Sequence, residues 1–174
     1  MRVIGFAGYS RSGKTHCSRY MKSWCEKHGY NPIEMSFSSV PVGANVPMKV
    51  THEQRQEELT VLFQNLKEEE KENYAKLCKY DLESEFKETI IIIDDVSFLD
   101  DIGFLKKHGG YCCFVDASSR IEVPTIKTVS DHLARSVTHG KYPLTLFNRI
   151  IDNNGTQKQT RKILEYVIPN LICE

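Results

Sequence analysis

Short apolar runs alternate along the chain with stretches whose apolar residues recur at helical spacing. The first run, Arg2–Ala7, is bounded by Gly8 and is typical of a buried strand. In Lys14–Lys27, apolar or small residues recur in steps of three and one, which indicates a helix. Further strands are predicted at Pro32–Phe37, Thr89–Ile93, Tyr111–Val115 and Phe147–Ile151. The isoleucine run among them is apolar on both faces, as expected of a central parallel strand.

More helices are predicted between and after these strands. One of these helices begins at Thr51, and a second covers Phe98–His108. A third runs from Thr128 or Ser130 to about His139, and the last begins at Thr156. Thr51 with Gln54, and Thr156 with Gln159, form two expected capping boxes. The alternating order predicts an α/β fold with a five-stranded parallel sheet and helices on both faces. Ligands of such sheets bind beyond the carboxyl ends of the strands.

Three stretches are less regular. Residues 38–50 are rich in Pro, Gly, Ser and Val and predict a loop, whereas the charged residues 67–88 predict a solvated helical face. Residues 117–146 combine a loop around Pro124 with the helix that ends near His139. The chain of 174 residues has the length of a single domain.

Composition and charge exclude several classes of protein. Lys and Arg total 23, as do Asp and Glu, so the net charge is zero and we expect no nucleic-acid partner. No apolar run approaches the ~20 residues that span a bilayer, so we expect no membrane segment. The six cysteines form no Cys-x-x-Cys pair and no export signal is visible, which predicts a cytoplasmic protein with reduced core cysteines. Cys112 and Cys113 should face opposite sides of the sheet.

Residues 8–15 read Gly-Tyr-Ser-Arg-Ser-Gly-Lys-Thr, the full G-x-x-x-x-G-K-[ST] pattern of a phosphate-binding loop, or P-loop. The pattern lies between a predicted strand and a predicted helix, which is the context that it requires. Gly8 and Gly13 permit backbone conformations that other residues resist, so the amides of Ser10, Ser12 and their neighbours can converge on a phosphate. The expected architecture is therefore a P-loop NTPase fold, a three-layer α/β/α sandwich.

The side chains of this loop predict a nucleotide site. Lys14 is expected to reach the β and γ phosphates, and the Thr15 hydroxyl is expected to ligate Mg²⁺. Arg11, inside the loop, has two open roles, because it either touches the transferred phosphoryl group or points into solvent.

Asp94 and Asp95 directly follow the isoleucine strand. A carboxylate at this place can hold Mg²⁺, usually through water, beside the hydroxyl of the P-loop. Neighbours on a strand point opposite ways, so the sequence leaves open which aspartate faces the metal. Capping of the next helix is the alternative role for one of them.

Four segments resemble the P-loop nucleoside monophosphate kinases, and most of all the phage-type deoxynucleoside monophosphate kinases. They are the loop at 8–15, Ser-Phe-Ser at 36–38, residues 90–116 and residues 147–164, which together cover about half of the chain. In this match Asp95, not Asp94, corresponds to the family's aspartate, and Ser97 replaces an arginine. Asp131 begins an Asp-His pair similar to the family's, but Arg135 stands where an acidic residue is expected.

The resemblance implies transfer of the γ-phosphoryl group of ATP, with Mg²⁺, to a (deoxy)nucleoside monophosphate. It implies that Ser36, Phe37 and Ser38 bind this acceptor. Residues 39–88 match no segment of the family, and we expect them to form an acceptor-binding helical insertion.

The same resemblance implies donor contacts near the end of the chain. Adenine is expected at the turn formed by Asn153, Asn154, Gly155 and Thr156, with helix capping as the alternative role of Thr156. Extra catalytic cations are expected at Arg120, which follows a strand, and at Arg135, in a lid region at 117–146.

Two other functions stay open at this point. The chain is either a P-loop kinase of another small metabolite or nucleoside, or a nucleotide-binding regulatory or assembly protein with little turnover. If the chain is a kinase, we expect its partners to be small-molecule nucleotide substrates. The sequence leaves open whether the protein forms a homodimer.

Overall fold

The computed structural model describes residues 1–37, 51–80, 83–121 and 129–173. The strands are β1 (Arg2–Ala7), β2 (Asn31–Met35), β3 (Thr89–Val96), β4 (Tyr111–Asp116) and β5 (Arg149–Asp152). The α-helices are α1 (Lys14–Lys27), α2 (His52–Lys79), α3 (Leu99–Lys107), α4 (Val129–Thr138) and α5 (Gln157–Cys173). Short 3-10 turns lie at η1 (Glu83–Glu85) and η2 (Leu144–Leu146).

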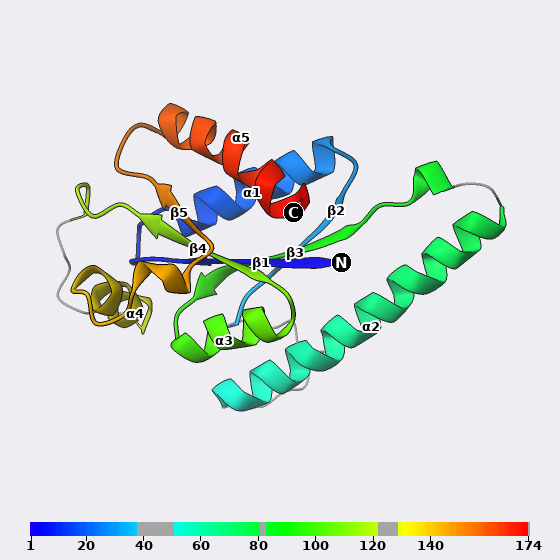
Figure 1. Ribbon diagram of the computed structural model, residues 1–174, viewed down its shortest axis with the longest axis horizontal. Coiled ribbons are helices and arrows are strands. Elements are labelled where there is room, and N and C mark those ends of the chain that lie inside the picture. Colours follow the sequence, from blue (N-terminus) through cyan, green and yellow to red (C-terminus); the bar gives the residue numbers. More distant parts are fainter. Residues whose placement is uncertain (38–50, 81–82, 122–128, 174) are drawn as a thin grey trace.

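The five strands form one parallel sheet in the order β2-β3-β1-β4-β5. Helices α1 and α5 cover one face, and α2, α3 and α4 lie on the other (Figure 1). The predicted three-layer α/β/α sandwich of the P-loop fold is therefore confirmed. The strand order reverses direction at β1, so the segment after β1 lies at the switch point where such sheets bind ligands.

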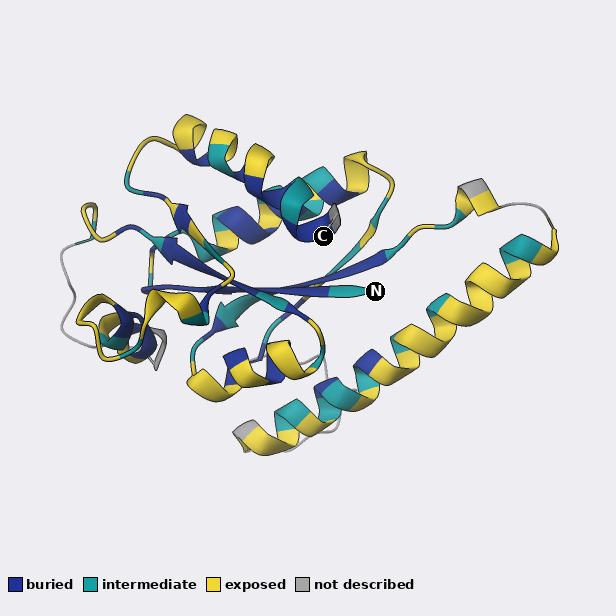
Figure 2. Cartoon of the chain, in the orientation of Figure 1, coloured by how far each residue is buried: buried dark blue, intermediate teal, exposed yellow. Residues whose placement is uncertain are grey.

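Alternation along the central strands produces two apolar cores. Ile90 and Ile92 pack with α1 and α5, whereas Ile91 and Ile93 pack with α2 and α3. Both faces of β3 are buried, as Figure 2 shows, which explains the uninterrupted isoleucine run. The neighbouring cysteines of β4 divide in the same way, as predicted: Cys112 lies in one core and Cys113 in the other.

A β-bulge interrupts the pairing of β1 with β3. Ile93 pairs with Gly5 and Val96 pairs with Ala7, so Asp94 and Asp95 together lie opposite one residue of β1. A bulge of this kind redirects side chains and is common beside functional sites. It lies at the carboxyl end of β3, where the sequence predicts the acidic site.

Most predicted boundaries are confirmed to within a few residues. The Thr51 capping box is present at α2, and the Thr156 amide and hydroxyl exchange hydrogen bonds with Gln159 at the start of α5. The solvated helical face predicted for 67–88 is present over residues 67–79, as an exposed continuation of α2 (Figure 2). Beyond Lys79 the prediction is wrong for the described residues, because Glu83–Glu85 form a 3-10 turn and residues 86–88 lie in neither a helix nor a strand. The predicted loop at 38–50 lies outside the described residues.

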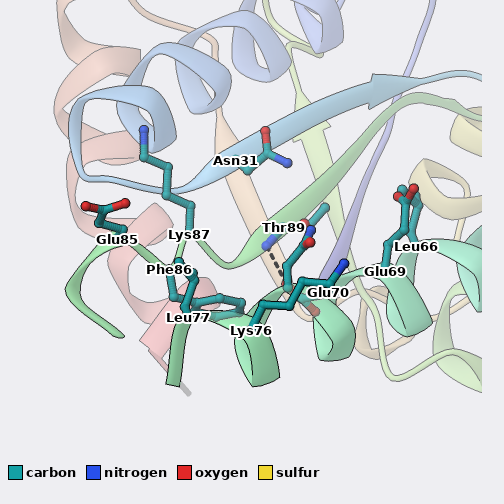
Figure 3. Close-up of a pocket in the computed structure, with 11 residues that line it drawn as sticks. Asn31, Leu66, Glu69, Glu70, Lys76, Leu77, Glu85, Phe86, Lys87 and Thr89 are labelled. Atoms are coloured by element: carbon teal, nitrogen blue, oxygen red, sulfur yellow. Dashed lines mark hydrogen bonds between the residues drawn. The ribbon is translucent and has the colours of Figure 1, made fainter. Parts of the chain in front are cut away.

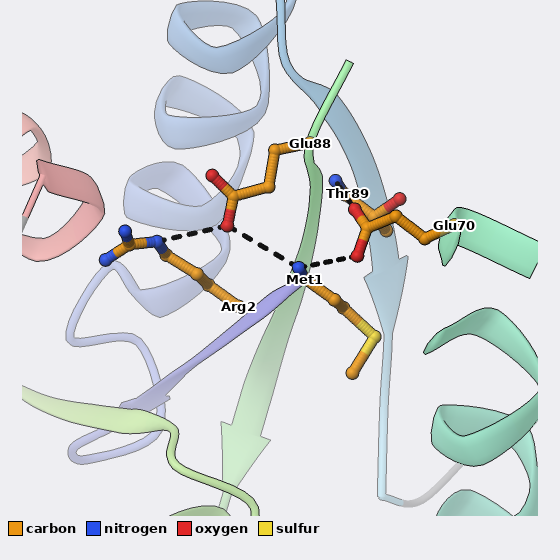
Figure 4. A network of polar contacts seen from close by, with 5 residues as sticks. All are labelled: Met1, Arg2, Glu70, Glu88 and Thr89. Atoms are coloured by element: carbon orange, nitrogen blue, oxygen red, sulfur yellow. Dashed lines mark hydrogen bonds and ion pairs between the residues drawn. The ribbon is translucent and has the colours of Figure 1, made fainter. Parts of the chain in front are cut away.

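An ion network joins the distal half of α2 to the sheet. The ammonium group of Met1 lies 2.6 Å from Glu70 of α2 and 3.5 Å from Glu88 (Figure 4). The other Glu70 oxygen accepts a hydrogen bond from the Thr89 amide at 2.7 Å, and Arg2 pairs with Glu88. These contacts position the long helix across the amino ends of the strands.

A cavity of about 500 Å³ lies beside this network (Figure 3). Its lining includes Asn31, Leu66, Glu69, Lys76, Phe86 and Lys87. It lies at the amino ends of β2 and β3, whereas the P-loop lies at the carboxyl ends of the strands.

Among the described residues, no helix is long and apolar enough to cross a lipid bilayer.

Replacement of a central isoleucine tests the packing of the sheet. Ile91 is fully buried, so Ile91→Ala should lower the free energy of unfolding by about 2–5 kcal/mol. Ile150→Ala, on the edge strand β5 with 45% of the side chain exposed, should cost less than about 1 kcal/mol. Urea unfolding followed by circular dichroism measures both. Equal losses in the two variants would contradict the described packing.

Candidate phosphate-binding site

The P-loop between β1 and α1 adopts a conformation that depends on its glycines. Gly8 has φ of 146° and Gly13 has φ of 100°, both in the region that favours glycine. A Cβ atom on Gly8 would approach the Val115 carbonyl oxygen to 2.6 Å. Arg11 has φ of 65° and an exposed side chain, which places its guanidinium at the surface of the loop.

The side chain of Asn153, which follows β5, contacts the P-loop. Its side-chain amide donates to the Ser12 carbonyl at 2.6 Å and accepts from the Thr160 hydroxyl of α5 at 2.5 Å. A Cβ atom on Gly13 would collide with the same amide group. Arg120 donates to the Ser12 carbonyl at 3.4 Å, so this predicted cation does lie against the P-loop.

Lys14 is held at the mouth of the loop. Its ammonium group donates to the carbonyl oxygens of Gly8 and Tyr9 at 3.0 and 2.9 Å. Burial lowers the pKa of Lys14 below its ordinary value. Three carboxylates oppose that pKa shift, in decreasing order Asp131, Asp94 and Asp95. The lysine is therefore influenced by negative side chains from both α4 and β3.

Helix α4 is docked onto the same loop by two hydrogen bonds. The Ser10 amide donates to Asp131 at 2.8 Å, and Asp131 is almost completely buried. The Tyr9 hydroxyl lies 2.6 Å from the Thr138 hydroxyl at the other end of α4. The lid region predicted at 117–146 thus contains a helix that contacts two consecutive P-loop residues.

The two aspartates of the bulge have different partners. The Thr15 hydroxyl donates to Asp94 at 2.9 Å. Asp95 accepts from the Ser36 hydroxyl at 2.6 Å and from the Phe37 amide at 2.7 Å. Asp94 therefore lies beside the P-loop threonine, and Asp95 lies against the segment that follows β2.

The oxygen atoms of Thr15 and Asp94 are suitable ligands for a hard cation. Thr15 and Asp94 offer only oxygen atoms, which Mg²⁺ prefers, and Mg²⁺ commonly takes few protein ligands together with phosphate oxygens and water. Within the described ranges, no group of three or more His, Cys, Asp or Glu side chains is arranged to hold a metal ion. A magnesium ion here would accordingly depend on a bound phosphate chain for the rest of its ligands.

The remaining predicted site residues are placed as follows. Asn154 donates from its side chain to Asp116 and Asp152 and accepts from Ser119, so it ties the ends of β4 and β5 together. Gly155 and Thr156 lie at the capping box of α5. Arg135 is exposed on α4. Ser38 lies outside the described residues.

Sequence reasoning missed two cations near Ser36. Arg55, on the first turn of α2, donates to the Phe37 carbonyl at 3.1 Å. Arg19, on α1, lines a cavity of about 410 Å³ together with Thr15, Ser36 and Asp94. Neither arginine is itself part of a motif, so only the fold brings the two side chains to the site. Arg19 does follow Thr15 by four residues, a spacing that places both on one helix face.

Comparisons with known proteins support the fold. No protein-family model matches the sequence, and no curated protein matches it. The structure of APE1195 aligns with a TM-score of 0.52 at 16% identity, covering 98% of this chain and 96% of that one.

Two structures of the Mycobacterium tuberculosis APS kinase CysC also align. The complex with AMPPNP and APS has a TM-score of 0.55 at 13% identity, covering 99% and 98% of the two chains. The Cys556Ala mutant has a TM-score of 0.51 at 12% identity, covering 95% and 96%. These likenesses extend along almost the whole chain, and at such identities they show the fold. They give no support to the phage-type subfamily that the sequence resembles.

The different partners of Asp94 and Asp95 predict different effects on metal binding. Asp94→Asn should weaken the Mg²⁺-dependent part of AMPPNP binding roughly 10- to 100-fold, as loss of a metal-site carboxylate does. Asp95→Asn should leave the Mg²⁺ dependence within about twofold of the original. Titration calorimetry with and without Mg²⁺ measures both. The reverse pattern would contradict the assignment of Asp94 to the metal side.

Proposed function

We propose that this protein is a kinase that transfers the γ-phosphoryl group of ATP to a nucleoside monophosphate. The observation that carries the proposal is the position of the Thr15–Asp94 pair. It lies between Lys14, at the mouth of the P-loop, and a cavity that reaches Ser36. A donor phosphate site, oxygen ligands for Mg²⁺ and space for a second substrate are thus adjacent.

The donor side is supported by the loop itself. The first amides of α1 have no partner within the helix, and the helix dipole adds partial positive charge at the same place. Lys14 would exchange its two carbonyl acceptors for phosphate oxygens. The APS kinase structure in complex with AMPPNP and APS has a similar fold, which supports ATP as donor here. When bound, Mg²⁺ would neutralise charge on the β and γ phosphates.

The acceptor side is supported by the contacts after β2. Asp95 holds the Ser36 hydroxyl and the Phe37 amide, and Arg55 holds the Phe37 carbonyl. This segment is therefore fixed beside the carboxyl end of β3. It is also where the sequence resemblance implies the monophosphate site.

The proposed reaction is an in-line displacement. An oxygen of the acceptor phosphate forms a bond to the γ-phosphorus while the bond from that phosphorus to the β,γ-bridging oxygen breaks, giving ADP and a nucleoside diphosphate. In this proposal Lys14 and the loop amides hold the donor, and Arg120, which donates to the Ser12 carbonyl of the loop, is the further cation for the transferred group. Positioning and charge neutralisation provide most of the catalysis in such reactions.

A second candidate is a kinase of another small metabolite. It is favoured by the two APS kinase structures, one of which is a complex with AMPPNP and APS. The donor site would be the same in both cases, because fold and acceptor chemistry vary independently.

A substrate screen tests the proposal. Protein, ATP and Mg²⁺ should release ADP in the presence of at least one of AMP, GMP, CMP, UMP, dTMP and dGMP. Lys14→Ala should lower that turnover at least about 100-fold, since an electrostatic contact to the transferred group is lost. Coupled detection of ADP gives the rates.

Lys27→Ala is the matched control, because Lys27 lies exposed in the last turn of the same helix and should keep full turnover. Turnover with APS or a nucleoside, and none with the six monophosphates, would favour the second candidate. No acceptor-dependent ADP release with any of them would contradict kinase activity.

A further inference from the structure

The cavity beside the P-loop has a distinct composition. It measures about 410 Å³, within the range of small-molecule sites. Thr15 and Asp94 line the end next to the candidate metal position, and Met35 and Ser36 line the part contributed by β2 and its end. Arg19 and Glu34 provide the other charged groups of the lining.

The two charged groups differ in how far they are already neutralised. Glu34 forms an ion pair with Lys22, with 2.9 Å between the ammonium nitrogen and a carboxylate oxygen, so its negative charge has a partner outside the cavity. Arg19 is exposed, and no hydrogen bond or ion pair to its guanidinium is found in the part of the chain that the structure describes. An unpaired guanidinium that lines a cavity favours an anionic ligand.

Helix geometry places Arg19 on the same side of α1 as Thr15. Arg19 follows Thr15 by four residues, so the two side chains are neighbours on one face of α1. Ser18, which also lines the cavity, donates its hydroxyl to the Thr15 carbonyl and adds no charge. An anion that contacts Arg19 would therefore lie in the same cavity as the Thr15–Asp94 pair, on the same face of α1.

We propose that this cavity is the acceptor subsite and that Arg19 binds the phosphate monoester of the acceptor. The inference rests on the proposed kinase function and names the residue that recognises the second substrate. The planar guanidinium of arginine matches two phosphate oxygens at once, which orients the group as well as attracting it. A neutral acceptor, such as a nucleoside, would leave Arg19 without a partner.

Kinetics of Arg19 variants give the first test. Arg19→Ala should raise KM for the monophosphate roughly 10- to 100-fold while KM for ATP changes less than about twofold. Arg19→Lys should recover part of the loss, since it restores charge without the planar fork. Lys27→Ala, which removes a cation from the same helix outside the cavity, should leave both constants unchanged. A rise in KM for ATP alone would overturn the assignment.

A second measurement does not depend on turnover. The Arg19 side-chain Nε–H resonance, assigned by its loss in Arg19→Ala, is followed in the presence of Mg²⁺ and AMPPNP. Each of the six monophosphates, the matching nucleosides and inorganic phosphate is added in turn. The resonance should shift with at least one monophosphate and stay unchanged with its nucleoside.

The two measurements separate the possible failures. Normal kinase turnover with no shift at Arg19 would overturn the Arg19 assignment and leave the proposed function intact. A shift with inorganic phosphate or a monophosphate, without turnover, would support the anion site and contradict the nucleoside monophosphate kinase. Neither shift nor turnover would overturn both proposals.

Discussion

The loop between β1 and α1 must hold several backbone amides pointing at one place, and the rest of the site depends on that constraint. Gly8 and Gly13 permit the required dihedral angles. Asn153 holds the Ser12 carbonyl from the β5 end, and Asp131 holds the Ser10 amide from α4. The loop is thus tied to both helical layers of the sandwich. Because polar groups buried without partners are costly, these ties stabilise the loop itself.

The same packing of β3 and α4 against the loop brings carboxylates near Lys14. The lysine is buried enough for its pKa to be lowered, and carboxylates from β3 and α4 oppose that effect. The positive charge of Lys14 is thus offset as folded by negative side chains from two different elements. A bound phosphate chain would compete with Asp131 for the Ser10 amide and with the loop carbonyls for Lys14. In the proposed kinase, binding of the donor and the position of α4 would therefore be linked through shared groups.

Local patterns predicted the fold and the donor loop, because strand alternation, capping boxes and the P-loop motif are encoded by neighbouring residues. The choice between Asp94 and Asp95 could not be predicted, because it depends on a bulge that arises from the register between β1 and β3. Arg19 and Arg55 were missed for a similar reason: their roles arise from the cavity and from Phe37, which only tertiary packing brings near them. The hydrogen bonds of the Asn153 side chain to Ser12 and Thr160 could not be predicted either, because they join segments that are distant in the sequence or depend on the turn before α5.

A backbone amide NMR titration with AMPPNP and Mg²⁺ tests phosphate binding by this loop. The amides of residues 10–15 should show the largest chemical-shift changes, and Gly13→Ala, whose methyl group would collide with Asn153, should abolish them. Shifts confined to other parts of the chain, or no saturable shifts at millimolar nucleotide, would contradict a phosphate-binding role for this loop.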